Sequence, residues 1–129
     1  GADRKKDEAV LYDAYNDSAG VTADFNLNLL TRINNELGGD FDLSAFTHDA
    51  PYNVEDGRIE MFLISSRDQV VKLGNRMFEF AAGERIHTEN SHKYEIEEFQ
   101  DLARNAGFAP KQVWSDAAAL FSVHYFEVE

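Results

Sequence analysis

The residues best suited to chemistry lie between His87 and Tyr94, in the run HTENSHKY. If residues 85–92 form a strand, their side chains alternate between its two faces, so Glu89 and Ser91 share one face. A carboxylate accepts hydrogen bonds, whereas a hydroxyl both donates and accepts them. The pair therefore suits a planar ligand with one N–H and one bare nitrogen, such as an imidazole. A polar strand that faces water is the alternative interpretation.

The same run contains two histidines that could bind a metal ion. His87, Glu89 and His92 would make a set of two histidines and one carboxylate, which is a known metal-binding combination. Strand alternation predicts that His87 shares the face of Glu89. The opposite face is predicted to carry Thr88, Asn90 and His92. Because His92 is separated from the other two, the sequence predicts no metal site.

The clearest structural element is a helix over residues 20–37, followed by a Gly-Gly stop. An apolar residue recurs at every fourth position, which predicts the buried face of the helix. This stripe consists of Val21, Phe25, Leu29, Ile33 and Leu37, with Leu30 beside it. The asparagines off the stripe are expected to face water; they are Asn26, Asn28, Asn34 and Asn35.

A shorter helical pattern ends at Tyr15, just before a break where Asp17 or Ser18 can cap the next helix. A ring at such a helix end can project into a cleft, although a core tyrosine with its hydroxyl at the surface fits the sequence equally well. Met61 lies in the middle of a predicted strand and is expected to pack in the core.

Strand patterns fill residues 47–92, where turn residues separate four or five antiparallel strands. Pro51 cannot donate to a sheet ladder, so its strand is expected at an edge or a bulge. A third amphipathic helix, over residues 96–106, precedes two further strands at residues 108–116 and 120–128. The sequence thus predicts an α+β fold with three helices and a largely antiparallel sheet of about five to seven strands, in one domain over residues 1–129.

The composition limits the partners of the chain. A net charge of −12 and a pI near 4.6 repel phosphate groups, so nucleic acid is not an expected partner. The chain has no cysteine, which fits a reducing compartment. No apolar run approaches the length that spans a bilayer. We expect a soluble cytoplasmic protein with neither nucleic acid nor membrane as a partner.

Several catalytic motifs are absent from the sequence. No G-x-G-x-x-G turn follows a strand, and neither a phosphate-binding P-loop nor a nucleophile elbow is present. Without cysteine there is no thiolate nucleophile. The chain is therefore expected to hold no adenosine cofactor by itself and to carry no catalytic residue.

Three segments, in order along the chain, carry a family resemblance: AYNDSAGVTADFN at residues 14–26, RIEM at residues 58–61, and GE at residues 83–84 with TENSHKY at residues 88–94. With them the chain resembles, from Gly1 to Glu129, the histidine-specific methyltransferases that depend on S-adenosylmethionine (SAM). Enzymes of this family trimethylate the α-amine of L-histidine on the route to ergothioneine.

The resemblance implies roles for four residues. Glu89 and Ser91 match the pair that holds the substrate imidazole, and Tyr15 matches a tyrosine at the amino-acid end of the substrate. Met61 matches a residue in the wall beside the imidazole. The family also implies SAM as the cofactor of the full-length enzyme, although this chain resembles only the C-terminal region. That region is the closing unit of a Rossmann-like methyltransferase plus a substrate-binding insertion.

Two functions from different classes follow. In the first, the chain is the substrate-recognition part of a histidine Nα-methyltransferase and is inactive when isolated. In the second, it is a stand-alone binding or assembly module without a catalytic role. Because some relatives of the family methylate indole-bearing amines, a tryptophan-like substrate is a further alternative to L-histidine. The expected protein partner is either a missing methyltransferase half or a second copy of the chain.

Overall fold

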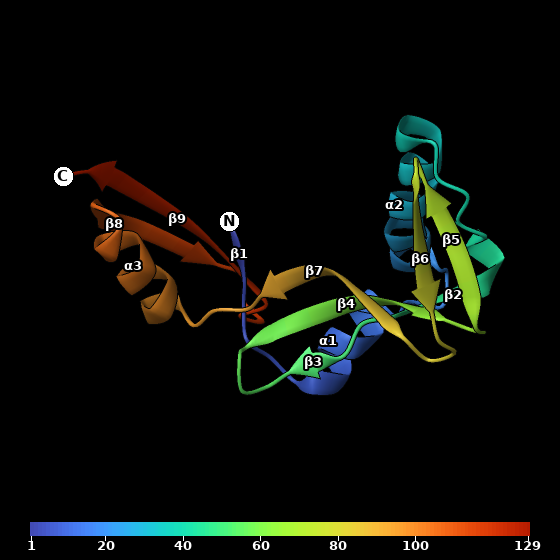
Figure 1. Cartoon of the computed structure of the whole chain (residues 1–129). Coiled ribbons are helices and arrows are strands. Elements are labelled where there is room, and N and C mark those ends of the chain that lie inside the picture. Colours follow the sequence, from blue (N-terminus) through green and yellow to red (C-terminus); the bar gives the residue numbers. More distant parts are fainter.

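The computed structural model describes all residues from 1 to 129, and it contains three helices and nine strands (Figure 1). The helices are α1 (Glu8–Tyr15), α2 (Val21–Leu37) and α3 (Ile96–Asn105), with a short 3-10 helix, η1 (Leu43–Ala45). The strands are β1 (Ala2–Asp3), β2 (Phe46–Asp49), β3 (Tyr52–Asn53), β4 (Arg58–Ser65), β5 (Gln69–Leu73), β6 (Arg76–Phe80), β7 (Arg85–His92), β8 (Phe108–Ser115) and β9 (Phe121–Val128). The predicted α+β class and antiparallel pairing are confirmed, but the strands form three sheets.

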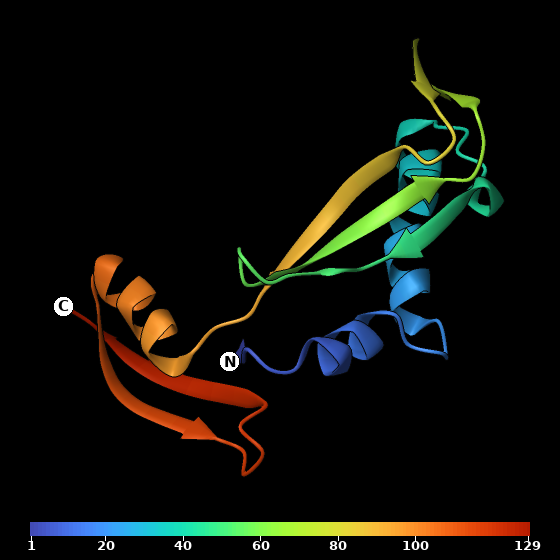
Figure 2. The same ribbon diagram turned by 90° about the horizontal axis from the view of Figure 1, so that it is seen from below.

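The central sheet is built around β4, which pairs with β7 along one edge and with β2 and then β3 along the other (Figure 2). Pro51 lies in the break between β2 and β3, where its missing N–H costs no ladder hydrogen bond. Its carbonyl accepts a hydrogen bond from the backbone of Glu60. The expectation that Pro51 belongs to an edge is confirmed.

Buried and partly exposed residues alternate strictly along β4, and the buried ones form the core. Ile59, Met61, Leu63 and Ser65 are buried, while the residues between them are partly exposed. One core cluster consists of Leu11 from α1 with Ala50, Ile59 and Met61; the other consists of Leu30 from α2 with Ala45, Phe46 and Leu63. Met61 is therefore a core residue, as its position in the strand predicts.

Helix α2 has the predicted extent, and Leu30 and Ile33 of its predicted apolar face pack in the core, but the prediction is wrong for the rest of the stripe. Val21 and Phe25 are 68% and 63% exposed, whereas Asn26 is only 3% exposed. The buried face carries Asn26 and Leu30, with Leu27 and Ile33 packed beside them. An α-helix has 3.6 residues per turn, so residues spaced four apart do not stay on one face but shift gradually around the helix. The polar contacts of Asn26 determine which face is buried.

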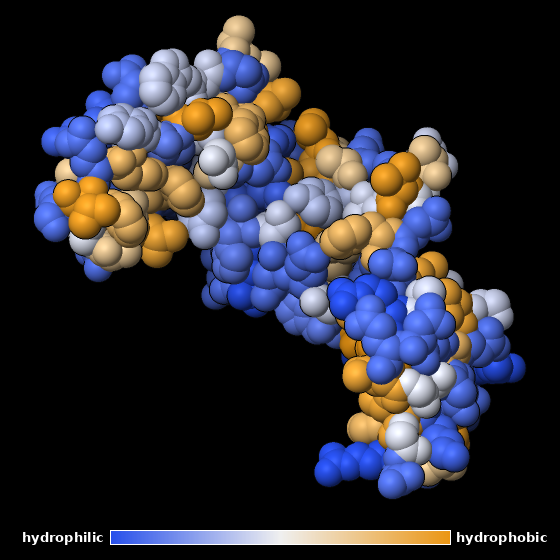
Figure 3. Space-filling model, turned by 90° about the horizontal axis from the view of Figure 1, so that it is seen from above, coloured by the Kyte–Doolittle hydropathy of each residue, from blue (hydrophilic) through white to orange (hydrophobic).

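The sheet of β1, β9 and β8 forms one end of a crescent, while α2 and the β5–β6 hairpin form the other, with the central sheet between them (Figure 1). Phe99 of α3 packs on one face of β9, with its ring 4.8 Å from that of His124. The opposite face of this end sheet exposes four large side chains, Trp114, Phe121, Val123 and Tyr125. Apolar residues accordingly gather at both ends of the molecule, with a largely hydrophilic region between them (Figure 3).

The N-terminal strand joins the end sheet to the central sheet. β1 pairs with β9, and the next residue, Arg4, forms an isolated parallel bridge to Tyr94, just beyond β7. None of the three helices combines the length and the apolar character needed to cross a bilayer.

Candidate functional site

A β-bulge in β7 determines how the residues of the HTENSHKY run are presented. Glu89 pairs with Met61 and His87 pairs with Phe62, so Thr88 is an extra residue without a partner on β4. Ser91 pairs with Ile59, which puts Glu89 and Ser91 on the same face, as predicted. His87 pairs with the opposite face of β4 and contacts Asn90, Nε2 to Oδ1 at 2.7 Å. The prediction that His87 shares the face of Glu89 is wrong, because the bulge inverts the alternation at Thr88.

The three residues considered as metal ligands do not share one face, but the predicted division is wrong, because the bulge moves His87 away from Glu89 and onto the face of His92. His92 pairs with Arg58 and therefore lies on the same face as His87, away from Glu89. No group of three or more histidine, aspartate or glutamate side chains in the chain is arranged to hold a metal ion.

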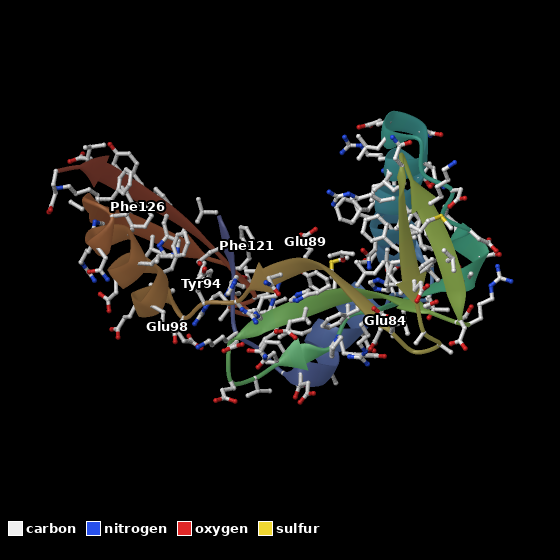
Figure 4. The ribbon with its side chains drawn as sticks, in the orientation of Figure 1. Glu84, Glu89, Tyr94, Glu98, Phe121 and Phe126 are labelled. Carbon is white, nitrogen blue, oxygen red and sulfur yellow. The ribbon has the colours of Figure 1, made fainter.

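Glu89 borders a hollow of about 170 Å³ between β7 and α2. Thr88 and Glu89 line it from β7, and five residues line it from α2: Phe25, Asn26, Asn28, Leu29 and Arg32. A cavity of about 150 Å³ can hold a benzene ring, so this hollow has room for an imidazole. It is smaller than the roughly 300–1,000 Å³ of complete small-molecule pockets, so it fits only part of an amino acid. Figure 4 shows the Glu89 side chain pointing from β7 into the open side of the crescent.

A chain of hydrogen bonds holds the bulge against α1 and α2. The Thr88 hydroxyl shares its one proton between Oδ1 of the buried Asn26, at 2.7 Å, and the carbonyl of Met61, at 3.1 Å. Asn26 Nδ2 donates to the carbonyl of Phe62 at 3.1 Å and contacts Nδ1 of His48 at 2.9 Å. His48 Nε2 lies 2.7 Å from the carbonyl of Tyr15, which can only accept, so Nε2 carries the proton and Nδ1 accepts from Asn26. The expectation that Asn26 faces water is wrong, since it joins the end of α1 to the bulge.

Tyr15 and Ser91, which are far apart in the sequence, lie side by side. Tyr15 Oη is 2.8 Å from Ser91 Oγ. The ammonium group of Lys93 donates to both oxygens, at 2.7 and 2.9 Å, and forms an ion pair with Asp3 at 2.8 Å. Lys93 is only 2% exposed and was not singled out from the sequence. The alternation that pairs Glu89 with Ser91 continues to residue 93, so a lysine on the buried face was the available signal.

Met61 lies opposite Glu89 on β4, in the core cluster against which Tyr15 packs. Directly paired residues on antiparallel strands bring their Cβ atoms to within about 4.5–5.5 Å. A shorter residue at position 61 would therefore enlarge the space next to Glu89. The hollow itself borders Glu89 but not Tyr15, Met61 or Ser91.

The two lysines beside Asp3 affect the pKa of its carboxyl group. Burial alone would raise the pKa of Asp3, but the hydrogen bonds and charges of Lys6 and Lys93 outweigh it and hold the pKa below the ordinary value of 3.8. A carboxyl group whose pKa is lowered in the folded state stabilises the fold at pH values above its ordinary pKa. This stabilisation is lost as the pH falls through the pKa of the folded state.

We therefore expect Asp3→Asn to destabilise the chain at neutral pH, with a difference from the unmodified chain that shrinks as the pH falls below about 4. Urea unfolding at a series of pH values measures this difference. Asp13→Asn, at an exposed aspartate on α1, is the matched control and should give a small difference at every pH. A difference for Asp3→Asn that stays constant down to acid pH contradicts the expectation.

Comparison with known proteins places these features in a family. The model of the family described as "Histidine-specific methyltransferase, SAM-dependent" matches residues 1–128. Proteins named Histidine N-alpha-methyltransferase from Mycolicibacterium smegmatis and Mycobacterium tuberculosis are 42% and 41% identical over 125 residues, or 95% of this chain and 39% of each relative. Ergothioneine biosynthesis protein 1 of Neurospora crassa is 33% identical over 121 residues, 89% of this chain and 13% of that protein. The chain thus spans about two fifths of the length of its mycobacterial relatives, and it belongs to the family of histidine-specific, SAM-dependent methyltransferases.

Proposed function

We propose that this chain is the substrate-recognition part of a methyltransferase that methylates the α-amine of L-histidine, with the imidazole held by Glu89 and Ser91. The observation that carries the proposal is the shared face of these two residues on β7, with Glu89 bordering a hollow of the size of one ring. The two mycobacterial relatives are named for the same substrate, which supports the proposal.

The two side chains have complementary hydrogen-bonding roles. The Glu89 carboxylate accepts from the N–H of a neutral imidazole, and the Ser91 hydroxyl pairs with the bare nitrogen. Tyr15, whose hydroxyl touches Ser91, lies next to the atoms that would hold the ring. A site that satisfies both ring nitrogens rejects rings that lack them, because its own polar groups would be left unpaired.

The contribution of the chain to the reaction is positioning. SAM, bound by another part of the enzyme, would supply the electrophilic methyl group. Holding the imidazole fixes the direction of the amine, and such fixed geometry supplies a large share of the rate in reactions between two bound partners.

The residues of this chain do not fit a SAM cradle. Adenosine cofactors bind at the carboxyl ends of parallel strands beside a glycine-rich turn, whereas all strand pairs here are antiparallel. We therefore attribute cofactor binding to the part of the relatives that this chain does not match. The uncovered apolar face of β8 and β9 supports a role for these strands as the closing strands of the methyltransferase sheet.

The proposal is tested in a chimera in which residues 1–128 replace the matching region of the Mycolicibacterium smegmatis relative. With SAM, this chimera is expected to methylate the α-amine of L-histidine, and the product is measured by mass spectrometry. The 129-residue chain alone is expected to transfer no methyl group. A folded chimera without histidine methylation contradicts the proposal, and histidine binding by the chain alone, seen by calorimetry, then supports a stand-alone binding module.

A further inference from the structure

We propose that Lys93 is a positioning residue that holds the Ser91 hydroxyl as a hydrogen-bond donor toward the substrate, so that the site takes a neutral imidazole with its bare nitrogen at Ser91. This inference rests on the proposed function, because it assumes that Ser91 contacts the ring.

The surroundings of Lys93 distinguish it from a surface lysine. Its side chain is fully buried, and its ammonium group contacts three acceptors: Asp3 Oδ2, Tyr15 Oη and Ser91 Oγ. The ammonium also lies 4.5 Å from the centre of the Tyr15 ring. A charge buried without partners is very unfavourable, and here the ion pair and the hydrogen bonds compensate for the lost water.

The number of protons available restricts what the two hydroxyls can do. An ammonium group only donates, so Tyr15 Oη and Ser91 Oγ each accept one hydrogen bond from Lys93. The two hydroxyls are also bonded to each other at 2.8 Å, and that bond uses one of their two protons. Only one hydroxyl proton is left to point at a ligand.

The phenol of Tyr15 is the stronger acid of the two and is therefore the better donor. Donation from Lys93 to the phenol oxygen strengthens this further, because hydrogen bonds in a chain polarise one another. When Tyr15 donates to Ser91, the serine oxygen accepts from both neighbours, and both its lone pairs are occupied. The remaining proton then belongs to Ser91, which can only donate.

A ligand nitrogen opposite Ser91 must consequently be an acceptor. An imidazole meets this condition in a single tautomer, with its N–H directed to Glu89 and its bare nitrogen to Ser91. A doubly protonated imidazolium would direct an N–H at a hydroxyl that has no free lone pair, with the charge of Lys93 behind it. Lys93 thereby determines which form of the ring the site accepts.

The experiment is a double-mutant cycle in the smegmatis chimera, with Lys93→Met and Ser91→Ala. Methionine fills a similar volume without donating, and Asp3 keeps its ion pair with Lys6. We expect Lys93→Met to raise the KM for L-histidine roughly tenfold, which corresponds to the loss of about one hydrogen bond. The kcat at saturating histidine should change less than about twofold. In the Ser91→Ala background, the same substitution should change KM less than about threefold.

Lys6→Met is the matched control, since it removes a cation from the same Asp3 carboxylate without contacting Ser91 or Tyr15. It is expected to leave KM unchanged. An equal effect of Lys93→Met in both backgrounds, or an equal effect of Lys6→Met, overturns the role of Lys93. Such a result leaves the proposed function standing, which fails only if the unmodified chimera does not methylate histidine or if Ser91→Ala and Glu89→Ala have no effect.

A second measurement covers the case in which Lys93→Met does not fold. In the unmodified chimera, the ¹⁵Nζ resonance of Lys93 should shift when L-histidine binds, because the ring changes the hydrogen bonding of Ser91. The shift should disappear in the Ser91→Ala variant. A resonance that does not respond to saturating histidine contradicts the proposal.

Discussion

Replacing Glu89 by alanine in the smegmatis chimera is expected to weaken histidine binding about ten- to one-hundredfold. The variant removes the acceptor for the ring N–H, and a hydrogen bond to a charged group is worth about 1.5–3 kcal/mol. The loss should appear in kcat/KM for L-histidine. It should be much smaller for L-tryptophan, whose indole offers fewer hydrogen-bonding groups to the site.

Adding Met61→Val should extend this change of specificity, since Met61 lies directly across from Glu89. Shortening this side chain opens space beside the lost carboxylate, so the double variant is expected to prefer tryptophan more than either single variant. Glu97→Ala, at an exposed position of α3, is the matched control and should leave both substrates unaffected. If the ratio of kcat/KM for the two amino acids is the same in the double variant as in the unmodified chimera, Glu89 does not contact the substrate ring.

Replacing Asn26 by alanine is expected to destabilise the chain by more than about 3 kcal/mol. The variant removes the partner of His48 Nδ1 and the Asn26 contacts of the Phe62 carbonyl and the Thr88 hydroxyl, all in a buried region. Thermal unfolding followed by circular dichroism should show a decrease in Tm of roughly 10 °C.

Asn35→Ala is the control for this prediction, because Asn35 lies on the same helix, is exposed and makes no side-chain hydrogen bond. It should change Tm by no more than about 2 °C. An equally small change for Asn26→Ala would mean that the Thr88 bulge holds its position without Asn26.

Local patterns in the sequence predict the helices and strands well, but they do not predict which face of α2 is buried. Its boundaries follow from the apolar repeat and from the glycines after it, which depend only on nearby residues. The choice of buried face depends on His48 and Thr88, which belong to other strands and reach Asn26 only in the folded chain. A buried asparagine has the same local signal as an exposed one.

The candidate site could be predicted only in part, because local patterns show only what nearby residues determine. The shared face of Glu89 and Ser91 needs only alternation over two positions, and it survives because both residues follow the bulge. His87 precedes Thr88, so the inverted alternation moves it to the other face. The meeting of Tyr15, Ser91 and Lys93 depends on how α1 packs on the central sheet, and a single sequence does not encode that contact in any local pattern.

The pairing of β1 with β9 has a consequence for how the parts of this fold can form. The Ser122 hydroxyl bonds to the carbonyl of Ala2, 120 positions earlier in the chain. A contact between positions so far apart closes a long loop, and the entropy of that closure is lost before the pairing stabilises the fold. The helices and the central sheet depend on contacts over shorter separations, so they can form before β1 and β9 pair. Asp3 is the residue that links the two stages, since it lies in β1 and forms the ion pair with Lys93 beside Ser91.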